Sequence, residues 1–150
     1  MQPTADFDPA KLARSLLRRR RQGALATLMA GTGDPYCSLV NLASGPEGAP
    51  ILLISRLAVH TRNILKDCRV SLMLDERSPG DPLEGARLML QGRAEPVGPE
   101  HLELARRRYL AAHPSAEAFV NFADFSFFRI VPGGAVFVPR SACVPDQSAK

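Results

Sequence analysis

Six polar or basic residues gather within nine positions, where the apolar run "ILLIS" gives way to a helical pattern. They are Ser55, Arg56, His60, Thr61, Arg62 and Asn63. The first turn of a helix has unpaired backbone N–H groups and the positive end of the helix dipole, which together stabilise an anion. Hydroxyl, amide and guanidinium groups nearby are suitable donors to phosphate oxygens. The cluster therefore predicts a phosphate site, although spacing alone also allows a simple helix cap at Ser55 beside solvated arginines.

Sequence motifs of other chemistries are absent. The chain has no GxSxG, Walker A, GxGxxG or HExxH pattern. Its three cysteines have no CxxC spacing, and its three histidines form no HxxxH or HxH pair. The sequence therefore predicts no protein-built metal centre and no disulfide framework, with reduced thiols at Cys37, Cys68 and Cys143.

Length and composition indicate one domain of ordinary globular type. The chain has 150 residues, 45% of them hydrophobic. It has no apolar run of the roughly 20 residues that span a bilayer, and no signal-peptide pattern. A cytoplasmic protein without membrane contact is therefore expected. The run Arg18 to Arg21 has no interleaved aromatic residues, which favours a solvated helix face over nucleic-acid binding.

The elements that must position the cluster follow from hydrophobic periodicity. Asp8 and Pro9 predict the start of an amphipathic helix over 9–22, closed by Gly23. Further helices are expected at 59–66, from Pro99 to His113, and over 115–120. Strands are expected at 24–30, 36–43, 51–55, 69–76 and 86–97, with two more around Pro132-Gly133-Gly134 in the segment 124–139.

The strands decide the fold class. They are mostly consecutive and do not alternate regularly with helices, so a parallel sheet is disfavoured. A mainly β fold is expected, as a small antiparallel barrel with helices packed outside. Gly92 inside the strand 86–97 predicts a bulge or a sharp bend. The tail 144–150 is predicted to be disordered, which leaves 1–143 as a single domain.

The segment "GDPYCSLVNLASGPEGAPILLISRLAVHTRNILKDCRVSLML" resembles the FMN-binding split barrel of the pyridoxamine-5'-phosphate oxidase-like superfamily. Within that superfamily it is most similar to the heme-utilisation branch. The motif "SRLAVHTRN" is the specific part, and "QGRAEPV" and "DFSFFRIVPGGAVFV" follow in the same order, so that the resemblance covers roughly 10–139. The fold that it implies is a split antiparallel β-barrel of Greek-key type with flanking helices.

The resemblance also implies a cofactor and its contacts. FMN would be bound noncovalently, with its phosphate at Ser55, Arg56, Thr61, Arg62 and Asn63, and His60 as a further donor. The flavin ring and ribityl chain would lie along Tyr36, Ser38, Leu39, Val40 and Asn41. The family usually forms homodimers with two FMN sites at the interface. A partner would then bring Gln91 and Arg93 to the ring.

Departures from the family pattern narrow the expected function. Pyridoxamine-phosphate oxidases carry basic residues on the second strand, where this chain has Tyr36 and Asn41, and their C-terminal tryptophan and arginine signature is missing. The expected function is therefore an FMN-dependent oxidoreductase of unknown substrate. Two alternatives stay open. One is a heme-binding or heme-degrading protein in which His60 or a C-terminal residue approaches the iron, and the other is a non-enzymatic flavin-binding module.

Overall fold

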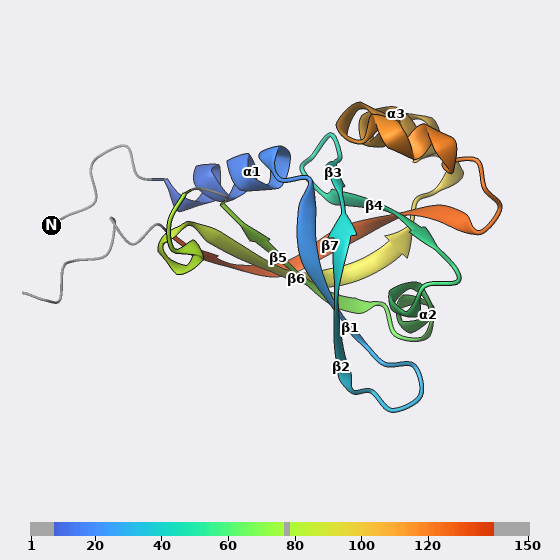
Figure 1. Ribbon diagram of the computed structural model, residues 1–150, viewed down its shortest axis with the longest axis horizontal. Helices are drawn as coiled ribbons and strands as arrows, with labels where there is room; N and C mark the ends of the chain where they lie inside the picture. Colours follow the sequence, from blue (N-terminus) through green and yellow to red (C-terminus); the bar gives the residue numbers. More distant parts are fainter. Residues whose placement is uncertain (1–7, 77–78, 140–150) are drawn as a thin grey trace, which may run out of the picture.

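The strands form one curled antiparallel sheet. The structure is a computed structural model that describes residues 8–76 and 79–139 (Figure 1). Within these residues seven strands pair in the order β2-β1-β5-β6-β7-β4-β3, and each pairing is antiparallel. Their bounds are Gln22–Leu28 (β1), Pro35–Asn41 (β2), Ala43–Ser44 (β3), Pro50–Ser55 (β4), Arg69–Asp75 (β5), Arg87–Pro96 (β6) and Phe125–Val138 (β7). The mainly β fold is confirmed.

The order of the strands explains why the sheet curls. β2 and β3 are its two ends, yet only Leu42 separates them in the sequence. The two ends of the sheet must therefore meet at that point. β4 lies beside β7 although β5 and β6 come between them in the chain, which is a Greek-key arrangement. The structure is thus consistent with a split barrel.

Helices lie around this sheet. They are α1 (Pro9–Arg19), α2 (Val59–Lys66) and α3 (Leu102–Ala112), with short 3-10 helices at Pro82–Glu84, Pro99–His101 and Pro114–Ala118. Among the described residues, no helix combines the length and the apolar character that crossing a membrane requires.

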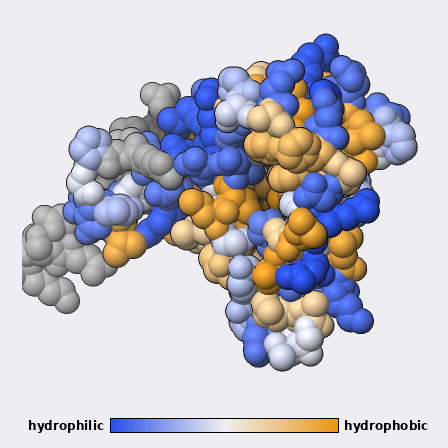
Figure 2. Space-filling model, turned by 45° about the vertical axis from the view of Figure 1, so that its right-hand side comes forward, coloured by the Kyte–Doolittle hydropathy of each residue, from blue (hydrophilic) through white to orange (hydrophobic). Residues whose placement is uncertain are grey.

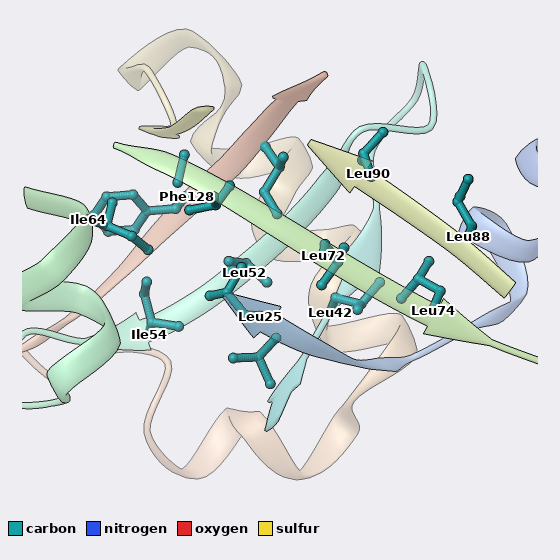
Figure 3. Close-up of a cluster of buried hydrophobic side chains, with 14 of the residues drawn as sticks. Leu25, Leu42, Leu52, Ile54, Ile64, Leu72, Leu74, Leu88, Leu90 and Phe128 are labelled. Carbon is teal, nitrogen blue, oxygen red and sulfur yellow. The ribbon is translucent and has the colours of Figure 1, made fainter. Parts of the chain in front are cut away.

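Alternation along the strands places apolar side chains inside the curl. The buried cluster there includes Leu25, Leu42, Leu52, Ile54, Leu72, Leu74, Leu88, Leu90 and Phe128 (Figure 3). α1 adds Leu16 to this cluster. A second cluster lies beneath α3 and joins Leu53 of β4 to Tyr109 and Phe127. β4 is therefore buried on both faces, which explains its continuous apolar run.

The first helix is shorter than the sequence predicts. Asp8 caps it as expected, because its carboxylate accepts hydrogen bonds from the backbone N–H groups of Ala10 (3.0 Å) and Lys11 (3.2 Å). The helix ends at Arg19, however, and β1 already begins at Gln22. Gly23 lies within β1 and does not end the helix. The strand packs closely there, because a Cβ added to Gly23 would lie 2.7 Å from Leu74 Cδ2. The helix predicted from Pro9 is confirmed, whereas its predicted end at 22 and its closure at Gly23 were wrong, because Gln22 and Gly23 pair with β2.

The segment after Asp124 is one strand, not two. β7 pairs with β6 from Arg87 opposite Val138 to Pro96 opposite Phe128. The register shifts at Gln91/Gly92, so the Pro-Gly-Gly sequence sits in a bulge instead of a turn. Proline lacks the N–H that a regular ladder needs, and a bulge tolerates this. The bulge predicted at Gly92 is confirmed, whereas the turn at Pro132 was wrong.

Other boundaries differ from the prediction by a few residues. The strand expected at 24–30 is β1, and the one expected at 36–43 divides into β2 and β3. The helix at 59–66 has the predicted bounds. The helix expected over 115–120 is the 3-10 turn Pro114–Ala118. The tail 144–150 and the end of the domain at 143 lie outside the described residues.

We expect Gly92→Ala to destabilise the fold strongly for a single methyl group. The added Cβ would lie 2.2 Å from the backbone oxygen of Val131, and backbone cannot move aside as a side chain can. The free energy of unfolding, measured by urea denaturation, should fall by about 1–3 kcal/mol. Gly134→Ala is the matched control, because no heavy atom lies within 4 Å of its added Cβ. Equal stabilities of the two variants would contradict the geometry of the bulge.

Candidate functional site

α2 fills the opening between two strands that diverge. β2 continues into β3, which pairs with the start of β4, so β2 and β4 are held together at one end only. α2 contacts both β1 and β2. It is anchored in the core by Ile64, which lies near Ile54 and Phe128 (Figure 3). The predicted cluster therefore sits at the split of the barrel.

Asn63 fastens α2 to the end of β1. Its side-chain oxygen accepts a hydrogen bond from the N–H of Ala30 (3.0 Å), and its amide nitrogen donates to Thr27 Oγ1 (3.0 Å). The same nitrogen lies 3.6 Å from Met29 Sδ. Asn63 is only 1% exposed, so these contacts are made inside the protein. Its polar groups are already used by the fold.

Thr61 is also turned inward. It is 0% exposed, and its Oγ1 has no hydrogen-bond partner within the described part of the chain. Arg62, Leu65 and Lys66 form the exposed side of the helix. Thr61 and Ile64 are three positions apart and therefore share the buried face. Of the donors predicted on this helix, Arg62 alone projects fully into solvent.

A carboxylate that no sequence pattern marks stabilises the turn before α2. Ser55 Oγ donates to Asp124 Oδ2 (2.6 Å), and the backbone N–H of Leu57 donates to Ser55 Oγ (3.1 Å). The N–H of Arg56 donates to the backbone oxygen of Asp124 (2.8 Å). The Ser55 proton is therefore engaged, and the hydroxyl has no second one to offer a ligand. No local pattern marks Asp124, because the β4–β7 pairing brings it here from 69 positions away.

His60 and Ser38 join α2 to β2. The distance from Ser38 Oγ to His60 Nδ1 is 3.2 Å, and either atom can donate, depending on the tautomer. His60 Nε2 makes no hydrogen bond to any described residue. Burial lowers the pKa of His60 from 6.5, because the charged form loses hydration. Burial thus favours the neutral imidazole, in which Nδ1 is engaged by Ser38 and Nε2 has no hydrogen-bond partner in the described part of the chain.

The residues predicted to lie along a flavin divide between the two faces of the sheet. Tyr36, Ser38 and Val40 point inward, and Val40 is in the core. Leu39 and Asn41 are exposed on the outer face. A ligand on one face of β2 cannot meet both sets of side chains.

Gln91 and Arg93 are also exposed, on the outer face of β6. β1 and β5 lie between β6 and β2, a separation of about 14 Å at the usual strand spacing. Within one protomer they are therefore apart from His60. Their role toward a partner's site stays a prediction.

The surface around α2 combines cations with apolar side chains. The guanidinium groups of Arg56 and Arg62 are exposed and form no ion pair among the described residues. Leu57, Leu65 and Phe122 are also exposed. Figure 2 shows hydrophobic surface among hydrophilic residues on the side of the molecule that comes forward from the right of Figure 1. Such a surface suits a ligand with a large apolar body and anionic groups.

Protein ligands for a metal ion are not grouped here. Within residues 8–76 and 79–139, no set of three or more His, Cys, Asp and Glu side chains is placed to hold an ion. Cys37 and Cys68 are free thiols. Cys143 lies outside the described residues.

Comparison with known proteins relates this barrel to others. A family model described as "CREG, beta-barrel" matches residues 4–138. The chloroplastic heme oxygenase HOZ of Arabidopsis thaliana is 39% identical over 129 residues, which are 85% of this chain and 39% of HOZ. A solved heme binding protein from Mycobacterium smegmatis is 33% identical, with a TM-score of 0.84 over 90% of this chain and 55% of that one. The protein Atu2129 of Agrobacterium tumefaciens, of unknown function, is 34% identical, with a TM-score of 0.82 over 91% and 58%. The chain thus spans less than two thirds of each of these three proteins.

Proposed function

The chain belongs to the CREG, beta-barrel family, and from that membership and the geometry around α2 we propose that it binds heme and supports heme breakdown. The resemblance to the heme-utilisation branch of the split barrels agrees with this membership. The observation that carries the proposal is the open imidazole nitrogen of His60, half-buried between α2 and β2. Two relatives above 30% identity, one named a heme oxygenase and one a heme binding protein, support heme over the FMN oxidoreductase expected first.

The contact between His60 and Ser38 is of the kind that orients a histidine that binds iron. A histidine that binds a metal through one nitrogen normally donates its other N–H to an oxygen acceptor. Here Nδ1–H can donate to Ser38 Oγ at 3.2 Å, which leaves Nε2 free for iron. Burial lowers the pKa of His60, which favours the neutral imidazole that metal binding requires.

The surroundings of His60 also fit the rest of a heme. Arg56, in the turn before α2, forms no ion pair among the described residues and could meet a propionate, whereas Arg62 lies two positions after His60 and therefore on another side of the helix. Leu57, in the same turn as Arg56, offers exposed apolar surface to the ring. When bound, heme supplies the one-electron and oxygen chemistry. Apart from Arg62, the side chains named here bind it and fix its orientation.

Heme titration of the purified protein, followed by the Soret band, tests this proposal. His60→Ala should weaken heme binding by about 100-fold or more and shift the band, because the iron loses its ligand. Ser38→Ala should cost about 10-fold, as expected for a group that orients a ligand. His101→Ala, at an exposed histidine on the 3-10 helix Pro99–His101, is the control and should bind like the wild type. An unchanged spectrum and affinity in the His60 variant would remove His60 from the site.

Flavin binding is the second candidate. The guanidinium groups of Arg56 and Arg62 near the start of α2, which pair with no described carboxylate, favour it, since FMN carries a phosphate. The inward positions of Thr61 and Asn63 and the engaged proton of Ser55 remove three of the predicted donors unless the fold rearranges. A protein purified with flavin absorbance and no Soret band would reverse the order of the two candidates. Oxidation of NADH or NADPH by that form would then restore the oxidoreductase prediction.

We also propose a homodimer, formed through the outer face of the sheet. Five apolar side chains stand opposite one another across five strands: Leu39, Ala24, Met73, Met89 and Val136. We call them the apolar row. Its members Leu39, Met73 and Val136 are 73%, 43% and 59% exposed, and no described element covers them. A two-fold related copy would bury the row against itself. The cytoplasmic location stays a prediction.

A further inference from the structure

A pocket lies on the outer side of β4, beside the start of α3. Its volume is about 220 Å³. α3 packs against β3 and β4 (Figure 1). Ile51 and Leu53 turn toward α3, whereas Leu52 and Ile54 turn into the core that α2 enters through Ile64. The pocket is therefore on the opposite face of β4 from the core beside α2.

Most of the side chains that line the pocket are apolar. They are Pro46 and Ala49 in the turn before β4, Ile51 of β4, Val97 after β6, and Leu104 and Ala105 of α3. An apolar cavity of about 150 Å³ is large enough to hold a benzene molecule. The pocket therefore has room for the branched or aromatic side chain of a small ligand.

The turn that forms one wall of the pocket is fixed by a side chain of α3. Arg108 Nε donates to the backbone oxygen of Ser44 (2.6 Å), and Arg108 Nη2 donates to that of Gly45 (3.3 Å). Within the turn, the N–H of Gly45 donates to the backbone oxygen of Ala49 (2.8 Å). The wall is therefore formed before a ligand arrives, which reduces the entropy that binding must cost.

Arg129 gives the pocket a positive charge that is only partly compensated. It lines the pocket and lies directly opposite Ile51 on β4 and Glu95 on β6. Its Nη2 is 3.6 Å from Glu95 Oε2, which is too long for a hydrogen bond, and the two side chains are 50% and 47% exposed. The guanidinium group therefore keeps N–H donors for the carboxylate of a ligand.

Carboxylates give the same pocket a negative charge. Glu47 lines it and forms no ion pair with any residue that the structure describes. A second carboxylate, of Glu100, lies beside the lining residue Gly98, since a Cβ added there would be 2.8 Å from Glu100 Oε1. His101 Nε2 is 3.7 Å from that oxygen. A ligand with a single charge would meet a group of like charge here, whereas a zwitterion can satisfy both signs.

We propose that this pocket binds an apolar α-amino acid. The carboxylate of the ligand would accept hydrogen bonds from Arg129, and its ammonium group would donate to Glu47. The apolar side chain would lie against Ile51, Val97 and Ala105. The proposal uses no residue of the heme site, so it does not depend on the proposed function.

Titration of the heme-free protein with L-phenylalanine, followed by amide chemical shifts in NMR spectra, tests the proposal. The dissociation constant should be about 1 mM or lower, as for a ligand of this size. The largest shifts should fall on the amides of Val97, Gly98 and Ala105. Phenylpropionate lacks the ammonium group and phenylethylamine lacks the carboxylate, and each should bind about tenfold more weakly. Glycine, which has no apolar side chain, should cause no shift.

Two single substitutions separate the two charges. Arg129→Gln should weaken binding of phenylalanine and phenylpropionate by about tenfold but should not weaken binding of phenylethylamine. Glu47→Gln should weaken binding of phenylalanine and phenylethylamine but not of phenylpropionate. Both side chains are exposed, so the variants should fold, as urea denaturation can verify. Lys66→Gln and Glu117→Gln remove the same charges at exposed positions outside the pocket and should bind like the wild type.

Three results would overturn the proposal. They are absence of shifts at millimolar phenylalanine, equal affinity of both pocket variants and the wild type, and tighter binding of either singly charged analogue than of phenylalanine. Because the protein is free of heme in this assay, failure of heme binding would leave the result intact.

Discussion

Met73→Glu is expected to convert the protein from a dimer into a monomer at micromolar concentration. Met73 is at the centre of the apolar row, with Ala24 opposite it on one side and Met89 on the other. In a two-fold interface the substitution occurs twice, so two carboxylates would be buried without partners. Such a burial costs about 3 kcal/mol or more, which raises the dimer dissociation constant by at least about 100-fold. Analytical ultracentrifugation measures the change directly.

A matched surface variant shows whether loss of the dimer requires a substitution in the apolar row or follows from any added surface charge. Leu83→Glu adds the same charge at a side chain that is also exposed but is on the 3-10 helix Pro82–Glu84, outside the row. It should remain dimeric. A wild-type protein that is monomeric would exclude the proposed dimer, and a Met73 variant that stays dimeric would place the interface on another face.

Asn63→Ala is expected to cost about 2–3 kcal/mol of unfolding free energy. The substitution leaves Thr27 Oγ1 without its buried partner and removes the link to Ala30. Leaving buried polar groups unpaired is the costly part, at about 1–3 kcal/mol for each group. Urea denaturation measures the loss. Leu65→Ala on the exposed side of the same helix is the control and should change stability by less than about 0.5 kcal/mol.

The same variant distinguishes a structural role of Asn63 from a role in ligand binding. If it only holds the fold, the folded variant should bind heme or FMN with nearly unchanged affinity, provided that binding is measured well below the denaturation midpoint. An unchanged stability together with a large loss of ligand affinity would instead return Asn63 to the ligand contacts predicted from the sequence.

The sequence predicted the elements that depend on local pattern. α2 has the expected bounds, because its helical periodicity follows a short turn after the apolar run of β4. β6 shows the expected alternation, with Leu88 and Leu90 buried. β7 was divided wrongly, because Pro132 and two glycines are typical of a turn when read alone. The pairing with β6 makes this segment one continuous strand, and a few neighbouring residues of the sequence do not reveal such a pairing.

The seam between β4 and α2 was predicted correctly, but the orientation of its side chains was not. The sequence placed the polar cluster at the strand-to-helix seam, which is where the structure has it. It did not indicate that Thr61 and Asn63 face inward, although the spacing from Thr61 to Ile64 points in that direction. Asp124 could not be found, because only the partner strand brings it to Ser55.

The hydrogen bond from Ser55 to Asp124 also sets the order in which the protein can mature. The β1–β2 hairpin can form as soon as it leaves the ribosome, since its residues are close in the chain. The turn before α2 must wait until the start of β7, 69 residues after Ser55, has been synthesised. A nascent chain that ends before Asp124 is therefore expected to lack the completed turn before α2 and, if the protein binds heme as proposed, to take up none. The region around α2 is thus completed only after most of the chain has been synthesised.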